Sequence, residues 1–346
     1  MSLPGGHLLQ SFIRNTFEAV VGNHDQPSLY AEAAGDPGLV GPGSISWELH
    51  SDVGAIAAAG MGAIIMEVLH PSVMAGVYDQ STYRTQPERR ARNTFGYVVV
   101  TTFAHRAAAE GMINRVRRMH ERVNGVRPDG TPYQAMDPEL IGWVHTAIPW
   151  AIMEAFHRYS RPLSDAEKNR YLAEQAVIGR MSGAGEVPET VDELHDYAEA
   201  MRPKLAVNQQ TTEFIDFLIG DVDGPLRASS WEQRNRRLGL QASLSLLPEW
   251  AARMTGLQHS PALRGCYLDP STRLNARALN WAYDGRPPWR AMAEARVMGT
   301  TSAHGSADAD DAGGTGRTRS GEPVTPDAPF YNAADHPVEL AATPSA

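Results

Sequence analysis

The feature that most constrains the fold is an apolar stretch, VGAIAAAGMGAIIMEVL, over residues 53–69. It is rich in Gly and Ala, contains Glu67, and falls short of the roughly 20 apolar residues that a membrane-spanning helix usually needs. A helix that is apolar on all sides belongs in a protein core. We therefore expect a long buried helix over 47–69, ended by His70 and Pro71, and no transmembrane segment.

Helical periodicity continues through most of the chain, whereas alternation of apolar and polar residues is rare. Pro87 suits the first turn of a helix, because its missing N–H would have no partner there. Ser164 with Glu167 forms a capping-box pattern, and Pro149 should kink the helix that contains it. The further expected helices are 89–102, 104–123, 139–159, one beginning after Ser164, one within 187–205, 208–219, 231–247 and 248–255. The predicted fold class is therefore all-α, a single large bundle domain of about ten helices.

From residue 299 the composition changes to Gly, Ser, Thr and Asp, with few large apolar side chains. Such a segment buries too little surface to offset the entropy lost on ordering. We expect a disordered tail over 299–346, a helical domain over 36–298, and an N-terminal segment with a short helix over 1–35.

The charge and cysteine content exclude several classes of function. The chain has 31 Lys and Arg against 40 Asp and Glu, a net charge of -9, which argues against a nucleic-acid partner because such binding needs a basic surface. The only cysteine, Cys266, excludes an intrachain disulfide, a thiolate zinc site and a cysteine-ligated iron–sulfur cluster. Together with an N-terminus that lacks the pattern of an export signal, it favours a cytoplasmic location. No nucleophile elbow, phosphate-binding loop or dinucleotide fingerprint supports a hydrolase or a nucleotide-dependent enzyme.

His120 is a titratable residue on the apolar face of an expected amphipathic helix. Val116, Met119 and Val123 form one apolar stripe, and His120 points with them, while the neighbouring arginines lie mostly on another side. A histidine that faces a core is commonly satisfied by a carbonyl or carboxylate, so the pattern leaves a metal ligand and a core histidine both open. His145, flanked by tryptophans in an apolar segment, presents a similar choice between a pocket-lining residue and a hydrogen-bonded core histidine.

Arg90 and Thr94 lie four residues apart and so share one helix face. An inward-facing arginine and hydroxyl would suit an anionic group at the edge of a buried pocket, such as a carboxylate or a haem propionate. The alternative is an exposed arginine cluster, which Arg90 would form with Arg89 and Arg92.

Two Glu-x-x-His pairs offer a different metal site. Glu67 with His70, and Glu154 with His157, show the spacing that helical bundles use for carboxylate-bridged di-iron or di-manganese centres. Two further bridging glutamates are not evident. A non-haem di-metal oxygenase built on these four residues is the first alternative function.

Five segments, taken in order, resemble the MpaB-type oxygenase family, which includes the catalytic domain of latex-clearing rubber oxygenases. They are LVGPGSISWELHSD, EVLHPSVMAGVYDQSTYRTQPERRARNT, RVRRMHERVNG, PELIGWVHTAI and LLPEWAARMTGL, between about residues 36 and 260. The resemblance implies a helical bundle with a buried pocket for non-covalent haem b. On these motifs His120 matches the iron ligand, and Arg90 with Thr94 matches the residues at the polar edge of the haem. These two are the expected catalytic residues, and His145 joins the expected haem-binding set.

Two departures from the family pattern concern the substrate. Rubber-cleaving members carry a lysine just before the motif threonine, where this chain has Asn93, and many relatives carry a histidine where this chain has Asp79. Polyisoprene is therefore not the expected substrate.

The predicted function is a haem b oxidoreductase that uses dioxygen or peroxide to oxygenate, cleave or desaturate a mostly apolar small metabolite. A haem- or ligand-binding helical protein without turnover is the second alternative, and the sequence identifies no redox partner.

Overall fold

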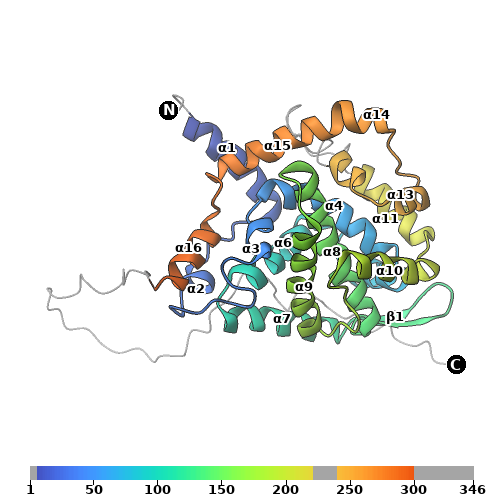
Figure 1. Ribbon diagram of the computed structural model, residues 1–346. Coiled ribbons are helices and arrows are strands. Elements are labelled where there is room, and N and C mark those ends of the chain that lie inside the picture. Colours follow the sequence, from blue (N-terminus) through green and yellow to red (C-terminus); the bar gives the residue numbers. More distant parts are fainter. Residues whose placement is uncertain (1–5, 221–239, 300–346) are drawn as a thin grey trace, which may run out of the picture. The chain divides into compact units, whose positions relative to one another are not determined.

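The computed structural model describes residues 6–220 and 240–299, and within them the chain is predominantly helical, as the sequence predicts (Figure 1). The helices before the hairpin are α1 (Gly6–Val21), α2 (Pro27–Tyr30), α3 (Ile45–Leu49), α4 (Val53–Val68), α5 (Pro71–Gln80), α6 (Pro87–Phe103) and α7 (Arg106–His120). The hairpin consists of β1 (Asn124–Val126) and β2 (Pro132–Gln134). The helices after it are α8 (Pro138–Tyr159), α9 (Asp165–Ser182), α10 (Val191–Met201), α11 (Gln209–Gly220), α13 (Glu249–Thr255), α14 (Pro261–Leu263), α15 (Asp269–Ala282) and α16 (Pro288–Val297).

The described ranges thus contain 15 α-helices, more than the expected ten or so, because several are short or follow residue 260. A 3₁₀ turn (Arg202–Lys204) follows α10, and a π-helical turn (Arg264–Leu268) precedes α15. Most of the helix expected over 231–247 lies outside the described residues. So does the tail expected over 299–346, apart from residue 299.

The expected single core helix is two helices, α3 and α4, in the structure. The side chain of Asp52 accepts a hydrogen bond from the backbone N–H of Ala55 at 2.8 Å and so caps the start of α4. Buried His50 is held at the break by Thr102 (Nδ1 to Oγ1, 2.6 Å) and by Tyr171 (Nε2 to Oη, 2.8 Å). The prediction of one helix was wrong because a side-chain cap competes with the continuous helix that apolar periodicity alone suggests.

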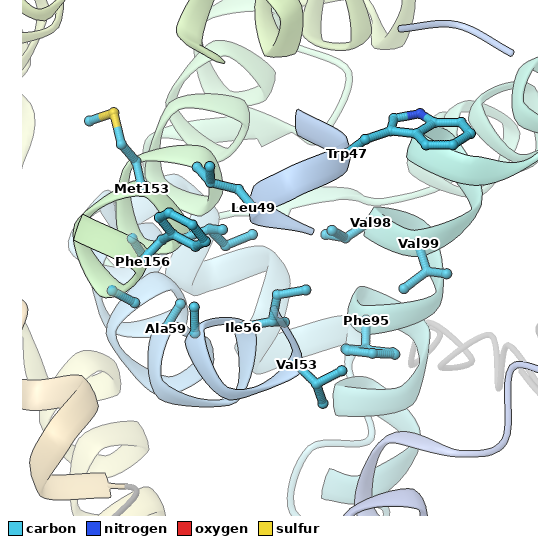
Figure 2. Packing of buried hydrophobic residues seen from close by; sticks show 14 of the residues in the cluster. Trp47, Leu49, Val53, Ile56, Ala59, Phe95, Val98, Val99, Met153 and Phe156 are labelled. Atoms are coloured by element: carbon cyan, nitrogen blue, oxygen red, sulfur yellow. The ribbon is translucent and has the colours of Figure 1, made fainter. Parts of the chain in front are cut away.

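α4 packs antiparallel to α8. The indole N–H of Trp143, near the start of α8, donates to the carbonyl oxygen of Met66, near the end of α4, at 3.0 Å. At the other end of the pair, the Ser160 hydroxyl after α8 donates to Asp52 before α4. Buried apolar side chains of these and neighbouring helices form a continuous core, part of which Figure 2 shows. The end of α4 and the first turns of α8 therefore meet at the same end of the helix pair.

α7 is shorter than expected at both ends. It begins after His105, whose Nδ1 accepts a hydrogen bond from the N–H of Ala108 at 3.3 Å, and it ends at His120. The segment 124–130, which follows the expected helix, forms one side of the β1–β2 hairpin and its turn, where Gly130 has a φ of +86°. Strands of three residues are too short to show alternation at period two, which is why the pattern missed them.

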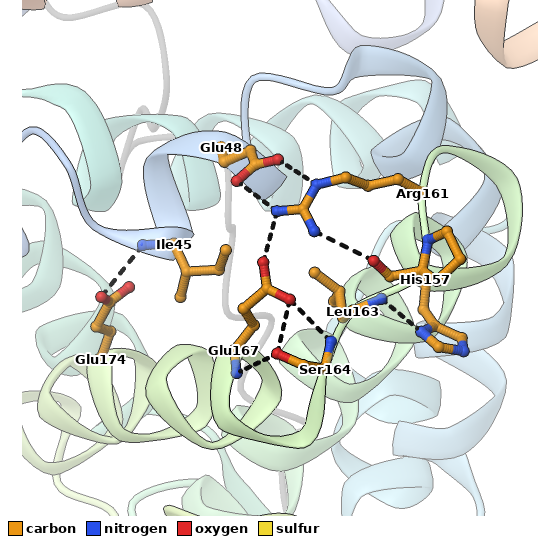
Figure 3. A network of polar contacts seen from close by, with 9 residues as sticks. Ile45, Glu48, His157, Arg161, Leu163, Ser164, Glu167 and Glu174 are labelled. Carbon is orange, nitrogen blue, oxygen red and sulfur yellow. Dashed lines mark hydrogen bonds and ion pairs between the residues drawn. The ribbon is translucent and has the colours of Figure 1, made fainter.

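The helix starts predicted from capping patterns are confirmed. α6 has Pro87 in its first turn. At the start of α9, Ser164 Oγ accepts from the N–H of Glu167 at 3.3 Å, and the Glu167 carboxylate accepts from the N–H of Ser164 at 2.8 Å (Figure 3). α8 runs through Pro149 and remains one helix.

Within the described ranges, no individual helix has the length and apolar composition needed to cross a bilayer. α4 and α5 meet this criterion only when taken together, and the two are bent by 106° at the break between them.

Candidate functional site

Side chains of four helices meet around His120, the last residue of α7. Arg90 of α6 lies close enough to His120 to lower the pKa of its imidazole, and Arg90 Nη2 is 3.5 Å from Oε2 of Glu67 on α4. His145 of α8 is near enough to His120 for its own pKa to be lowered by that neighbour. Tyr97 of α6 packs edge-on against the His145 ring, with 5.9 Å between the ring centroids. Three of the residues expected at the site, Arg90, His120 and His145, are therefore brought together.

The carboxyl of Glu67 and the guanidinium of Arg90 form a pair with spare hydrogen-bonding capacity. Glu67 is 5% exposed, and burial raises the pKa of its carboxyl to about 7, although the charge of Arg90 opposes the shift. The Arg90 side chain is 25% exposed, so it does not belong to an exposed cluster with Arg92. Its Nε atom is buried and has no hydrogen-bond partner among the described residues. Because an arginine carries five N–H donors, Arg90 keeps donors for an additional anionic group.

His120 is neutral at physiological pH and its ring is unused. Burial lowers the pKa of the imidazole to about 4, and the positive charge of Arg90 lowers it further. Among the described residues the ring makes no hydrogen bond or ion pair. A neutral imidazole with a free nitrogen is the form of histidine that binds a transition metal.

His145 is held in place without the use of its ring nitrogens. Burial, and next the charge of His120, lower the pKa of the ring to about 4. Tyr97 packs against the ring on one side and is itself fixed by a 2.7 Å hydrogen bond between its hydroxyl and Ser182 Oγ. α9 also approaches His145 closely, since a Cβ on Gly179 would lie 3.3 Å from the Cβ of His145. Neither ring nitrogen forms a hydrogen bond with a described residue, and the side chain is partly buried.

Thr94 and Asp79 have different surroundings. Thr94 lies one turn after Arg90 on α6 and is partly buried, and its hydroxyl forms no hydrogen bond with any described residue. Asp79, at the end of α5, accepts a hydrogen bond from the hydroxyl of Tyr133 at 2.8 Å. Asp79 therefore anchors the β1–β2 hairpin to α5.

The structure contradicts the alternative di-metal site. Glu67 and His70 lie at the end of α4 that meets the start of α8, whereas Glu154 and His157 lie about three turns further along α8, roughly 16 Å away. His70 caps α5 through Nδ1, and His157 Nδ1 accepts from the N–H of Leu163 at 2.9 Å (Figure 3). No group of three or more His, Cys, Asp or Glu in the described ranges is arranged to hold a metal ion.

Two residues of the site were not anticipated. Tyr97 follows Arg90 by seven positions and Thr94 by three, so its place on the same face of α6 could have been read from helical spacing. Ser182 carries no sequence signal, because only the packing of α9 against α6 and α7 brings it to Tyr97.

Comparison with known proteins defines the class of the chain. A family model described as "ER-bound oxygenase mpaB/B'/Rubber oxygenase, catalytic domain" matches residues 47–281, more than half of the chain. The chain therefore belongs to this family and is an oxygenase catalytic domain. The matched range contains Glu67, Arg90, Thr94, His120 and His145. No curated protein and no solved structure matches the chain significantly.

Proposed function

We propose that the chain is a haem b-dependent oxygenase in which His120 binds the iron. The observation that carries the proposal is the pair of neutral, unpartnered imidazoles of His120 and His145 beside Arg90. The family match supports the oxygenase class. The choice of haem rests on the motif resemblance around Arg90, Thr94 and His120, together with the donor chemistry of these residues.

The residues fit haem b in both charge and donor type. Haem iron takes a neutral imidazole as axial ligand, and its propionates take charged donors. His120 has the free neutral imidazole, and Arg90 has a buried Nε without a partner. The unpaired hydroxyl of Thr94, one turn along α6, would suit the same polar edge.

When bound, the haem would supply the redox and oxygen chemistry. The protein's own part is to orient the reactants and to control protons. Glu67 holds a carboxyl whose pKa of about 7 allows it to release or take up a proton at neutral pH. Arg90 favours the ionised form of that carboxyl, so the Arg90–Glu67 pair sets how readily the proton moves.

A mostly apolar small molecule is the proposed substrate, with dioxygen or peroxide as oxidant. The proposal is supported by the apolar side chains that accompany the site residues along α4 and α8, including buried Met66, Leu69 and Ala147. Oxygenation, oxidative cleavage and desaturation are all compatible with such a site, and product analysis distinguishes them.

We also propose a reducing, cytoplasmic location, because the only cysteine, Cys266, is exposed and unpaired.

The absorption spectrum of the haem-reconstituted protein tests the cofactor. We expect a Soret band, loss of bound haem in His120→Ala, and retention in His195→Ala, which removes an exposed histidine of α10. A wild-type protein without a Soret band after reconstitution would contradict the proposal. A Soret band that shifts with ligands, but without product from apolar metabolites under oxygen and a reductant, would identify a haem-binding protein without turnover.

A further inference from the structure

We propose that α15 and the turn before it dock on an anionic lipid surface, with the start of α1 as a second apolar contact. The inference goes beyond the proposed function and does not depend on a cofactor. It concerns a part of the molecule that carries none of the residues of the candidate site.

Large apolar side chains are exposed along one line of α15. Leu274 is 70% exposed and Trp281 is 40% exposed, and the two lie two helical turns apart on one side of the helix. Tyr267, seven residues before Leu274 in the π-helical turn, is 55% exposed. On its other side α15 buries Ala276 and Leu279 in the protein. The helix therefore has a core-facing side and a second apolar side that the described part of the chain leaves uncovered.

The start of α1 places two more apolar side chains beside this helix. Leu8 and Leu9 are 68% and 52% exposed. α1 packs against α15, and Gln10 Nε2 donates a hydrogen bond to the carbonyl oxygen of Trp281 at 3.0 Å (Figure 1). Single exposed apolar side chains are ordinary on a protein surface, whereas a group of them marks an interaction surface. The α1–α15 face is defined by Leu8, Leu9, Tyr267, Arg273, Leu274, Arg277 and Trp281.

The charge of this face is positive, although the chain has a net charge of -9. Arg273 and Arg277 are both exposed and lie four residues apart, on one flank of the apolar line. The Arg277 side chain forms no hydrogen bond or ion pair with a described residue, and Arg273 Nε donates only to the carbonyl oxygen of Arg158, at 3.0 Å. Between residues 261 and 283 the sequence has one acidic residue, Asp269, which is only partly exposed. The α1–α15 face therefore lacks the carboxylates that would neutralise its arginines.

This combination of side chains fits an anionic membrane surface. Leucines on an amphipathic helix enter the boundary of the acyl chains, and tryptophan and tyrosine favour the level of the headgroups. Arginines on the flank can donate to lipid phosphates while their aliphatic parts stay on the apolar side. α15 has 14 residues, so it is too short to cross a bilayer and would lie in the plane of the surface. Anionic lipids are characteristic of the cytoplasmic leaflet, which agrees with the proposed location.

A second copy of the chain fits the same face less well. In a two-fold symmetric dimer the same surface patch lies on both sides of the contact. Arg273 and Arg277 would then approach the equivalent arginines of the other copy. Like charges that meet without carboxylates oppose association. Lipid phosphates, in contrast, supply the negative charge that the α1–α15 face lacks.

Co-sedimentation of the full chain with lipid vesicles tests the proposal. We expect binding to vesicles of phosphatidylcholine and phosphatidylglycerol in equal parts, much weaker binding to phosphatidylcholine alone, and weakening by salt. The double variant Arg273→Gln, Arg277→Gln should bind at least about fivefold more weakly, because one arginine near an anionic surface contributes about that factor. Leu274→Ser should weaken binding by at least about the same factor, because it removes the most exposed apolar side chain of the face.

Matched controls change the same kinds of side chain elsewhere. Val177→Ser removes an apolar side chain of α9 that is 42% exposed, and the double variant Arg118→Gln, Arg122→Gln removes two exposed charges at the end of α7. Both should bind the mixed vesicles as wild type does. Brominated acyl chains should quench the fluorescence of wild type more than that of Trp281→Phe, which reports directly on this face. Thermal melts show whether each variant is folded.

The contrary outcomes are distinct. No binding to either kind of vesicle, or equal binding by wild type and all variants, would overturn the proposal. Sedimentation velocity that shows a dimer for wild type and a monomer for Leu274→Ser, without vesicle binding, would assign the face to a second copy instead. None of these measurements requires haem, so a failure here leaves the proposed function intact, and the reverse also holds.

Discussion

Arg90 of α6 and Glu67 of α4 form a partly buried ion pair, with 3.5 Å between Nη2 and Oε2, beside the imidazole of His120. Because the pKa of the Glu67 carboxyl is about 7, this pair is only partly ionised at neutral pH. A buried group whose charge changes near neutrality, next to a candidate metal ligand, is typical of a functional site.

Replacing Arg90 by alanine should destabilise the protein and weaken haem binding. Without the guanidinium, the Glu67 carboxyl loses the cation that favours its ionised form and becomes a buried acid without a partner. We expect the free energy of unfolding at pH 7 to fall by about 1–3 kcal/mol, as measured by denaturant titration. The double variant Arg90→Ala, Glu67→Gln should recover part of this loss. A loss in the double variant equal to the sum of the losses in Arg90→Ala and Glu67→Gln would show that the two side chains are not coupled.

Replacing Glu67 by glutamine should change the pH dependence of stability. The folded pKa of about 7 lies above the usual glutamate value of 4.5. The contribution of Glu67 to stability is therefore complete below pH 4.5 and is lost as the pH rises through 7. Glu67→Gln cannot ionise and keeps a polar group near Arg90. We expect the variant to gain stability relative to wild type between pH 5 and pH 8. An unchanged difference between the two proteins at these pH values would be the contrary result.

Acid should destabilise the fold through its buried histidines. Burial lowers the pKa of His50 from 6.5 to about 3. The contribution of His50 to folding stability is therefore present above pH 6.5 and is lost as the pH falls towards 3. His50→Gln should lower the slope of unfolding free energy against pH in this window by up to one proton, about 1.4 kcal/mol per pH unit. His195→Gln, at an exposed position, should leave the slope unchanged. The same slope in all three proteins would contradict the assignment to His50.

Two glycine substitutions in helices should have opposite effects. A Cβ on Gly54 would lie 2.5 Å from the Cα of Ala276, so Gly54→Ala must push α15 away from α4 and should lower the unfolding free energy by about 1–3 kcal/mol. A Cβ on Gly111 of α7 would meet nothing within 4 Å, so Gly111→Ala should raise the free energy of unfolding by about 0.5–1 kcal/mol. Thermal melts of both variants provide the measurement. A gain in stability for Gly54→Ala would show that α15 does not pack closely on α4.

Local patterns in the sequence predicted most of the helices, because periodicity and caps act within a few residues. The Ser164–Glu167 capping box and the proline at the start of α6 are examples. The break at Asp52 was missed because its cap lies inside an otherwise apolar run, and the final helices α15 and α16 were not anticipated as separate elements.

In the candidate site, too, local patterns predicted some features, whereas others depend on how the helices pack. Helical spacing indicated that His120 faces inward, and in the structure it is partly buried, with burial lowering the pKa of its imidazole to about 4. No local pattern could pair Arg90 with Glu67 or His145 with Tyr97, because each pair joins separate helices whose contact depends on the assembled bundle. The Glu-x-x-His spacing suggested a di-metal site because it is a local pattern that does not show where the two helices bring their motifs. The two pairs, one from α4 and one from α8, lie at opposite ends of an antiparallel helix contact.

Titration of haem b into the protein, followed at the Soret band, tests the central claim most directly. We predict saturation at one haem per chain for wild type and for His195→Ala. For His120→Ala we predict an affinity more than about tenfold weaker, equivalent to about 1.4 kcal/mol. Equal haem affinity in wild type and His120→Ala would contradict the account.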